Sequence, residues 1–251
     1  MTTRILCAAI ALTTLVGTAD VASNVYTVVV NDGTFAEPVL IDNQQVEIYD
    51  AETDTTTTED FTNVTFKANS IFRKRGTGYM LSSLGMSSFT GEIRIEEGAF
   101  VINTNNQMGV TTSAANAPLI VVSNGASFVM ATRANTCAFK ALKIYNSFQI
   151  AGDGVDNLGA ICNDNGTSQQ DFLFYGDWTL ADDASVGSTK NTRFDMSRPI
   201  DLAGHVLTTR KVTDSGVFCL SGDACVMTNS AGMPSRIVVD GHKIQLQSGL
   251  K

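Results

Sequence analysis

Two pairs of aspartates are the side chains in this sequence best suited to acid–base chemistry. Asp153 and Asp156 flank a short glycine-containing segment, and Asp182 and Asp183 are adjacent in the chain. Paired carboxylates hydrolyse glycosidic bonds when one protonates the leaving group and the other attacks or activates water. Adjacent residues of a strand face opposite sides, however, and aspartates beside glycines commonly form turns. We therefore interpret both pairs as structural and predict no catalytic residue.

The two histidines, His205 and His242, each follow a glycine, which places them at equivalent corners of a repeat. A metal site needs several ligands close together, and the regular spacing of a calcium-binding loop is absent around the aspartates. Motifs of zinc proteases, thiol redox proteins, serine hydrolases and phosphate-binding loops are absent as well. The sequence therefore predicts no metal and no cofactor.

Aromatic residues between 172 and 178 offer a platform on which a sugar ring could stack. The candidates are Phe172, Phe174, Tyr175 and Trp178. Trp178 takes the same place in the repeat as Ile93, which is expected to point inward. We therefore assign Trp178 to the core rather than to a binding surface.

Short runs of alternating apolar residues, separated by glycines, must position all of these side chains. Alternation indicates strands with one buried face, and glycine supplies the turn conformations between them. Between residues 72 and 102 the pattern is most regular, in Gly76-x-Gly78, Phe89-x-Gly91, Ile93-x-Ile95 and Gly98-Ala99-Phe100. This combination resembles the autotransporter-associated β-strand repeat, a unit of roughly thirty residues in the secreted passengers of bacterial autotransporters. The resemblance implies a right-handed parallel β-helix.

The same frame recurs along the chain. Superposing Gly98 on Gly125 aligns Ile93 with Ile120, and we expect further copies of the frame from Leu142 and from Trp178. A second frame, with an apolar residue four before a glycine, begins at Ile200, Phe218 and Ile237. These frames predict that nine residues point into the core: Ile93, Ile95, Ile120, Val122, Trp178, Leu180, Leu202, Leu220 and Val239.

The composition of the runs selects the kind of repeat. Threonine, serine, asparagine and glycine interrupt every few residues, and valine, isoleucine and phenylalanine fill the runs, which excludes a helical solenoid. We predict an all-β, right-handed parallel β-helix. An antiparallel sandwich or jelly roll stays open, because Asn31–Gly33 and Asn124–Gly125 are typical of hairpin turns.

The first residues are typical of an export signal. Arg4 precedes an apolar stretch from Ile5 to Val16, and small residues up to Ala19 form a cleavage site, with Ser23 as a second choice. The alternative is a buried first strand or helix of the fold. We predict a signal peptide at 1–19 and one domain at 20–251, secreted or on the bacterial cell surface, outside the outer membrane.

Net charge and cysteine content limit the functions and the disulfide pairings that are possible for this chain. A net charge of −8, with 17 lysines and arginines, argues against nucleic-acid binding. The basic run Arg73–Arg75 is interpreted as a solvated turn, and the acidic, threonine-rich segment from Asp50 to Asp60 as a projecting loop or a solvated edge. Four cysteines remain after the signal, with three possible disulfide pairings or none: Cys137, Cys162, Cys219 and Cys225.

We expect an exported, surface-associated structural or adhesin-like passenger module without catalysis. The alternative is a carbohydrate-active β-helix enzyme, either a polysaccharide lyase or a hydrolase, and a phage-fibre segment is a third possibility. Expected partners are a surface glycan or a host cell-surface ligand, and self-association or further coils beyond Ile244–Leu246. Contact with the outer membrane is expected only through a translocator that this sequence does not contain.

Overall fold

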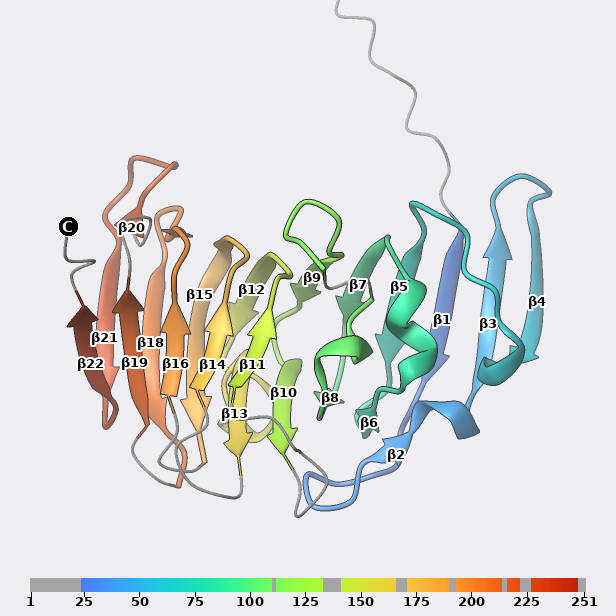
Figure 1. Ribbon diagram of the computed structural model, residues 1–251, viewed down its shortest axis with the longest axis horizontal. Coiled ribbons are helices and arrows are strands. Elements are labelled where there is room, and N and C mark those ends of the chain that lie inside the picture. The colour runs from blue at the N-terminus through green and yellow to red at the C-terminus, as the bar shows by residue number, and fades with distance from the viewer. Residues whose placement is uncertain are drawn as a thin grey trace, which may run out of the picture.

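The computed structural model describes residues 24–109, 112–132, 141–165, 171–189, 193–213, 216–221 and 227–247. Within these ranges the chain is all-β, with twenty-two strands, five short 3-10 helices and no α-helix. None of the described helices is long and apolar enough to cross a membrane. The strands lie side by side along the longest axis in long parallel sheets (Figure 1). The all-β expectation is confirmed, and the sheets are compatible with a β-solenoid.

The parallel strands form three stacks, each built from strands far apart in the sequence. The first stack contains β1 (Val25–Val29), β5 (Ile71–Arg75), β7 (Glu92–Ile95), β9 (Leu119–Val122), β12 (Phe148–Gly152), the first part of β15 (Trp178–Ser188), β17 (Ile200–Asp201) and β20 (Met227–Thr228). Each strand pairs in parallel with the next one along this series. Consecutive members are separated by one circuit of the chain, which passes through the second stack, and this arrangement is compatible with a β-solenoid.

The second and third stacks repeat this arrangement. The second contains β2 (Val39–Leu40), β6 (Tyr79–Leu81), β8 (Ala99–Ile102), β10 (Ser127–Thr132), β13 (Ile161–Asn165), the second part of β15, β18 (Val206–Lys211) and β21 (Arg236–Asp240). The third contains β11 (Ala141–Ile144), β14 (Asp171–Phe174), β16 (Arg193–Met196), β19 (Val217–Ser221) and β22 (Lys243–Gln247).

Short 3-10 helices stand where the chain has no strand of the third stack. Two pairs of them are in contact, η1 (Ile41–Asn43) with η2 (Phe61–Asn63) and η3 (Leu84–Ser88) with η4 (Asn105–Gln107). The helix η4 also contacts β11, the first strand of the third stack. A fifth helix, η5 (Val155–Asn157), lies in the loop after β12.

One part of the fold departs from the parallel arrangement. The strands β3 (Gln45–Asp50) and β4 (Thr55–Asp60) form a hairpin, and β3 pairs antiparallel with β1 (Figure 1). The segment from Asp50 to Asp60 is therefore the solvated edge that we expected, because all residues of β4 are exposed. Asn124–Gly125, in contrast, is no hairpin turn, since it joins β9 of the first stack to β10 of the second.

The core is a ladder of inward side chains, one from each circuit. Phe72, Ile93, Ile120, Phe148 and Trp178 follow one another in register through the first stack, and each is at most 1% exposed. Aromatic rings pack edge to face along this ladder, with 5.8 Å between the ring centroids of Phe148 and Trp178. The apolar interior therefore runs continuously along the stacks.

Most of the predicted core residues are buried. Seven of the nine are at most 6% exposed: Ile93, Ile95, Ile120, Val122, Trp178, Leu180 and Leu202. Leu220 is half-buried, and Val239 is not buried, since its side chain is 50% exposed. Val239 is in register with the buried Thr209 and so keeps an inward direction. It is exposed because β21 pairs only with β18, and no described strand covers its other edge.

The repeat frames are correct from Ile93 to Ile120 and to Trp178, and wrong elsewhere. Leu142 belongs to the third stack, and Phe148 is the residue in register with Ile120. The second frame does not compare one circuit with the next. Ile200 lies in the first stack, Phe218 in the third and Ile237 in the second. The pattern marks different sides of the circuits, because every side needs an apolar pair followed by a turn.

Candidate functional site

A polar pocket of about 510 Å³ lies at the turns that join the first stack to the second. Asp153 lines it from the segment after β12, Asp182 and Asp183 from the middle of β15, and Arg210 and Arg236 from β18 and β21. The two aspartate pairs of the sequence thus contribute to one site, with Asp153 from the first pair and both members of the second. The interpretation of both pairs as structural, without a catalytic role, stays a prediction.

A bulge in β15 brings Asp182 and Asp183 to the same surface. The register places Ile150 opposite Leu180 but Gly152 opposite Ala184, so β15 contains two extra residues at this point. Leu180 and Ala184 are buried, while the side chains of Asp182 and Asp183 are 65% and 68% exposed. Adjacent aspartates would face opposite sides in a regular strand, but a bulge re-aims its side chains.

Backbone and side-chain contacts hold the two carboxylates in place. Asp182 Oδ1 accepts a hydrogen bond from the backbone N–H of Asp183 at 2.7 Å, and Asp183 Oδ1 accepts one from the N–H of Val206 at 2.9 Å. His205 Nδ1 lies 3.8 Å from Asp182 Oδ1 and 3.7 Å from Asp183 Oδ1. His205 therefore completes a cluster that the sequence does not indicate, because it lies one circuit further along the chain.

Arginine balances part of this negative charge. Arg210 Nη2 donates to Asp153 Oδ1 at 3.1 Å, across an open surface where the Asp153 side chain is 57% exposed. Arg236 lines the same pocket from the next strand of the second stack. The pocket thus combines three carboxylates with two guanidinium groups, which suits a ligand with many hydroxyl groups.

The donor atoms of Asp182, Asp183 and His205 lie within 4.8 Å of one another, which is the closest approach to a metal site among the described residues. Both carboxylates are largely exposed and already accept backbone hydrogen bonds. The absence of a metal or cofactor requirement stays a prediction.

Two further cavities adjoin this pocket, and we call the three adjoining cavities the groove. A cavity of about 430 Å³ shares Asn124 with the first pocket, and one of about 350 Å³ shares Tyr79 and Asp156 with the second cavity. The Tyr79 hydroxyl donates to Asp156 Oδ2 at 3.0 Å, and burial together with this contact raises the pKa of Tyr79. Asp156 therefore belongs to the groove but not to the pocket of Asp153.

The aromatic platform is not present around Trp178. Trp178 is fully buried, and its ring centroid lies 4.9 Å from that of Phe174, so its assignment to the core is confirmed. Tyr175 is half-buried and stacks on Tyr145, with centroids 5.1 Å apart. The side chain of Phe172 lies outside the described residues.

Lys74 is a polar core residue that the sequence pattern did not lead us to expect. The prediction of a solvated turn at Arg73–Arg75 is wrong for Lys74, which is fully buried in β5. Arg73 and Arg75 do reach the surface, where each places its Nε 2.7 Å from a carboxylate oxygen of Glu96. Strict alternation is the signal that indicates the burial, because Lys74 follows the inward Phe72 by two residues.

The described cysteines are buried. Burial raises the pKa of the Cys162 thiol, and Arg193 Nη2 donates to the Cys219 sulfur at 3.2 Å. Cys137 and Cys225 lie outside the described residues, so the disulfide pairing stays a prediction. The expected signal peptide at 1–19 also lies outside them.

Among known proteins, no family model, no curated protein and no solved structure matches this chain.

Proposed function

We propose that the chain is an exported, surface-associated module that binds its partner without catalysis, on a right-handed parallel β-helix of the kind found in autotransporter passengers. Three stacks of parallel strands in continuous register support the fold, and the glycine-punctuated repeat supports the likeness to passengers. Nearly all parallel crossovers in proteins are right-handed, which supports the handedness.

The ligand that the site supports best is a glycan. The observation that carries this proposal is the convergence of Asp153, Asp182 and Asp183 with Arg210 and Arg236 in one open pocket that continues as a groove. Carboxylates accept hydrogen bonds from sugar hydroxyls, and guanidinium groups donate to ring and hydroxyl oxygens. Three adjoining cavities match an extended polymer better than a compact ligand.

The environment of the carboxylates favours binding over bond cleavage. A general acid is a carboxyl group kept protonated by an apolar surrounding. Asp182 and Asp183 are open to solvent and accept backbone hydrogen bonds, and Asp153 is paired with Arg210. No apolar surrounding encloses these carboxyl groups, and their oxygens already accept hydrogen bonds, so all three suit hydrogen-bond acceptance.

The proposal is tested by titrating the full chain with a panel of neutral and acidic oligosaccharides while reducing ends are assayed in the same samples. We expect saturable binding without release of sugar ends. Asp183→Asn should weaken the binding at least about tenfold, the loss of one to two charge-assisted hydrogen bonds. Glu59→Gln, on the distant hairpin, is the matched control and should bind as the wild type does. Absence of binding across the panel would contradict the proposal.

Glycoside cleavage is the second candidate, favoured by the approach of His205 to Asp182 and Asp183, the two aspartates that line a pocket together with two arginines. A polysaccharide hydrolase would release reducing ends, and a lyase would release unsaturated ends. Activity that disappears in Asp182→Asn but persists in Glu59→Gln would establish this candidate in place of binding alone.

A further inference from the structure

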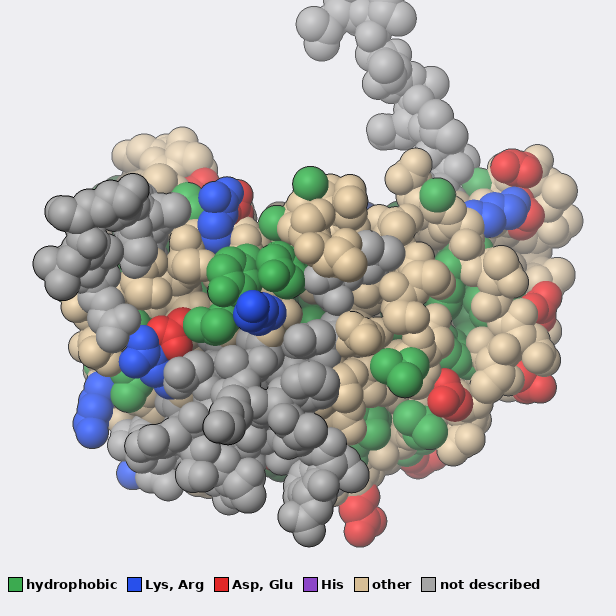
Figure 2. Space-filling model, in the orientation of Figure 1, with side chains coloured by type: hydrophobic (Ala, Val, Ile, Leu, Met, Phe, Trp, Pro, Cys, Tyr) green, Lys and Arg blue, Asp and Glu red, His purple; other side chains and the backbone are tan. Residues whose placement is uncertain are grey.

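The two ends of the stacks carry opposite charge. At one end, residues 45–60 of the β3–β4 hairpin contain no lysine or arginine and six carboxylates: Glu47, Asp50, Glu52, Asp54, Glu59 and Asp60. At the other end, the described residues of β21, β22 and the adjoining tip of β18 carry Arg236, Lys243 and Lys211 against one carboxylate, Asp240. Figure 2 shows acidic side chains gathered at the hairpin end and basic side chains at the opposite end.

The two ends also differ in how the core terminates. At the hairpin end the outermost strand is β4, whose side chains are all polar and exposed. At the other end, Val239 and Leu246 are 50% and 75% exposed, although both occupy inward positions of the register. Val239 is the register partner of the buried Thr209 on the neighbouring strand, and Leu246 is the register partner of Leu220. The apolar core is therefore open at the β21–β22 end within the described part of the chain.

Both ends present strand edges that can accept a further strand. Among the described strands, β4 pairs only with β3, β21 only with β18 and β22 only with β19. The strand β4 has six residues, and β21 and β22 have five each, so their edges match in length. Unpaired edges of this kind are templates for another chain.

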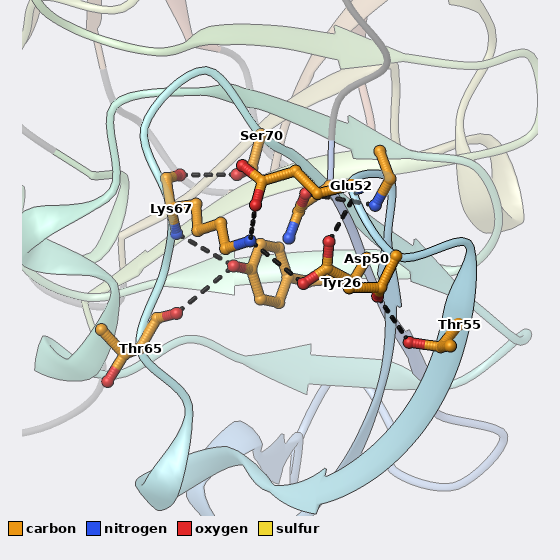
Figure 3. A network of polar contacts seen from close by, with 10 residues as sticks. Tyr26, Asp50, Glu52, Thr55, Thr65, Lys67 and Ser70 are labelled. Atoms are coloured by element: carbon orange, nitrogen blue, oxygen red, sulfur yellow. Dashed lines mark hydrogen bonds and ion pairs between the residues drawn. The ribbon is translucent and has the colours of Figure 1, made fainter.

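Polar contacts fix the acidic end against the stacks, so it is a preformed surface (Figure 3). Lys67 Nζ lies 3.0 Å from Asp50 Oδ2 and 3.5 Å from Glu52 Oε2, and the Lys67 N–H donates to the Tyr26 hydroxyl at 2.9 Å. The Tyr26 hydroxyl in turn donates to the Thr65 carbonyl at 3.3 Å. Lys67 ties the hairpin to the loop before β5, while Glu59 and Asp60 remain exposed on β4.

We propose that the acidic β3–β4 end of one copy docks on the basic β21–β22 end of a second copy, so that chains assemble head to tail. Contact between like ends would oppose charges of the same sign, whereas unlike ends attract. The threonine side chains of β4 carry methyl groups that can cover Val239 and Leu246 of the neighbouring copy. Because the contact joins two different surfaces, it repeats from copy to copy and builds a filament.

Light scattering and sedimentation velocity on the full 251-residue chain test the proposal at low ionic strength and in about 1 M NaCl, where charges are screened beyond about 3 Å. We expect concentration-dependent association at low ionic strength that salt reduces. Glu59→Lys with Asp60→Lys makes the exposed β4 edge basic like the opposite end, and Lys211→Glu with Lys243→Glu makes the β21–β22 end acidic like the hairpin. Each double variant should be monomeric alone, and an equimolar mixture of the two should associate.

The mixture is the decisive measurement, because a misfolded variant would not regain association with its complement. Lys143→Glu, on an exposed position of β11, controls for a charge reversal away from both ends and should associate as the wild type does. A wild-type chain that is monomeric at both ionic strengths overturns the proposal. Association of either double variant alone, or a mixture that stays monomeric, overturns it equally. Arg236 is left unchanged, so that glycan binding can be measured on the same variants and can fail separately.

Discussion

Lys74 and Ile95 are register partners on neighbouring strands, and both point into the core although only one of them is apolar. The Lys74 ammonium donates to the carbonyl oxygens of Gly78 at 2.7 Å and Glu97 at 2.8 Å, and also to that of Gly76. Burial lowers the pKa of Lys74 to about 8. One side chain thus satisfies carbonyl groups from the turns of two successive circuits.

Replacing this lysine should be costly for the fold. Lys74→Met keeps the length of the side chain but leaves three carbonyl oxygens without this donor, so the free energy of unfolding should fall by about 2–4 kcal/mol. Arg75→Met removes an exposed ion pair with Glu96 and should cost less than about 1 kcal/mol. Urea unfolding followed by circular dichroism measures both. Equal losses in the two variants would show that Lys74 has no special role.

The ladder of the first stack should be more sensitive to truncation than its open end. Ile120→Ala removes a fully buried side chain between Ile93 and Phe148, so we expect a loss of about 2–5 kcal/mol in the free energy of unfolding. Val239→Ala, with the half-exposed side chain, should cost less than about 1 kcal/mol. Chemical denaturation of the two variants checks this order. The reverse order would mean that Val239 is covered in solution.

Stability should fall at acid pH partly because of His242. Burial lowers the pKa of His242 to about 4, and neither ring nitrogen has a hydrogen-bond partner among the described residues. Below about pH 6.5 the unfolded chain binds a proton at this residue while the folded chain does not. The contribution of the buried, neutral His242 to the free energy of unfolding is therefore complete above pH 6.5. It is lost as the pH falls towards 4.

Substitution isolates this effect. His242→Phe keeps an aromatic ring beside Phe194, whose centroid lies 6.4 Å from that of His242, and removes the titrating group. The dependence of unfolding free energy on pH between 6.5 and 4 should be shallower in the variant than in the wild type. Identical slopes would show that other groups cause the acid sensitivity.

Removing the bulge in β15 should abolish oligosaccharide binding and leave the fold intact. Deleting Asp182 and Asp183 together makes the step from Leu180 to Ala184 equal to the step from Ile150 to Gly152, which restores one-to-one pairing with β12. We expect a thermal midpoint within a few degrees of the wild type and complete loss of oligosaccharide binding. A deletion that unfolds the chain would show that the bulge is structural, and retained binding would exclude the pocket.

The class of fold is predictable from the sequence because alternation has a direct physical cause. An inward side chain recurs every second residue, and glycine marks the turns, so Ile93, Ile120 and Trp178 align correctly on their pattern alone. Alternation does not say which side of a circuit a strand occupies. The frames at Ile200, Phe218 and Ile237 look alike because each side of a circuit needs inward apolar residues followed by a turn.

The pocket could not be predicted from the sequence. Asp153, Asp182 and His205 are separated by full circuits, and only the register of β12, β15 and β18 brings them together. The bulge that exposes Asp182 and Asp183 depends on a mismatch between two strands, which a single strand does not reveal. Lys74 is hard to predict for a related reason, since its charge suggests the surface while its place in the alternation indicates the core.

The all-polar edge strand β4 also restricts how this architecture can change in length over evolution. A new circuit is stable only if its apolar face stacks on another apolar face. The strand β4 offers none, because all six of its side chains are exposed and polar. Duplicated circuits could therefore be retained within the stacks or on the side of β21 and β22. On the side of the β3–β4 hairpin an added circuit has no apolar face to stack on.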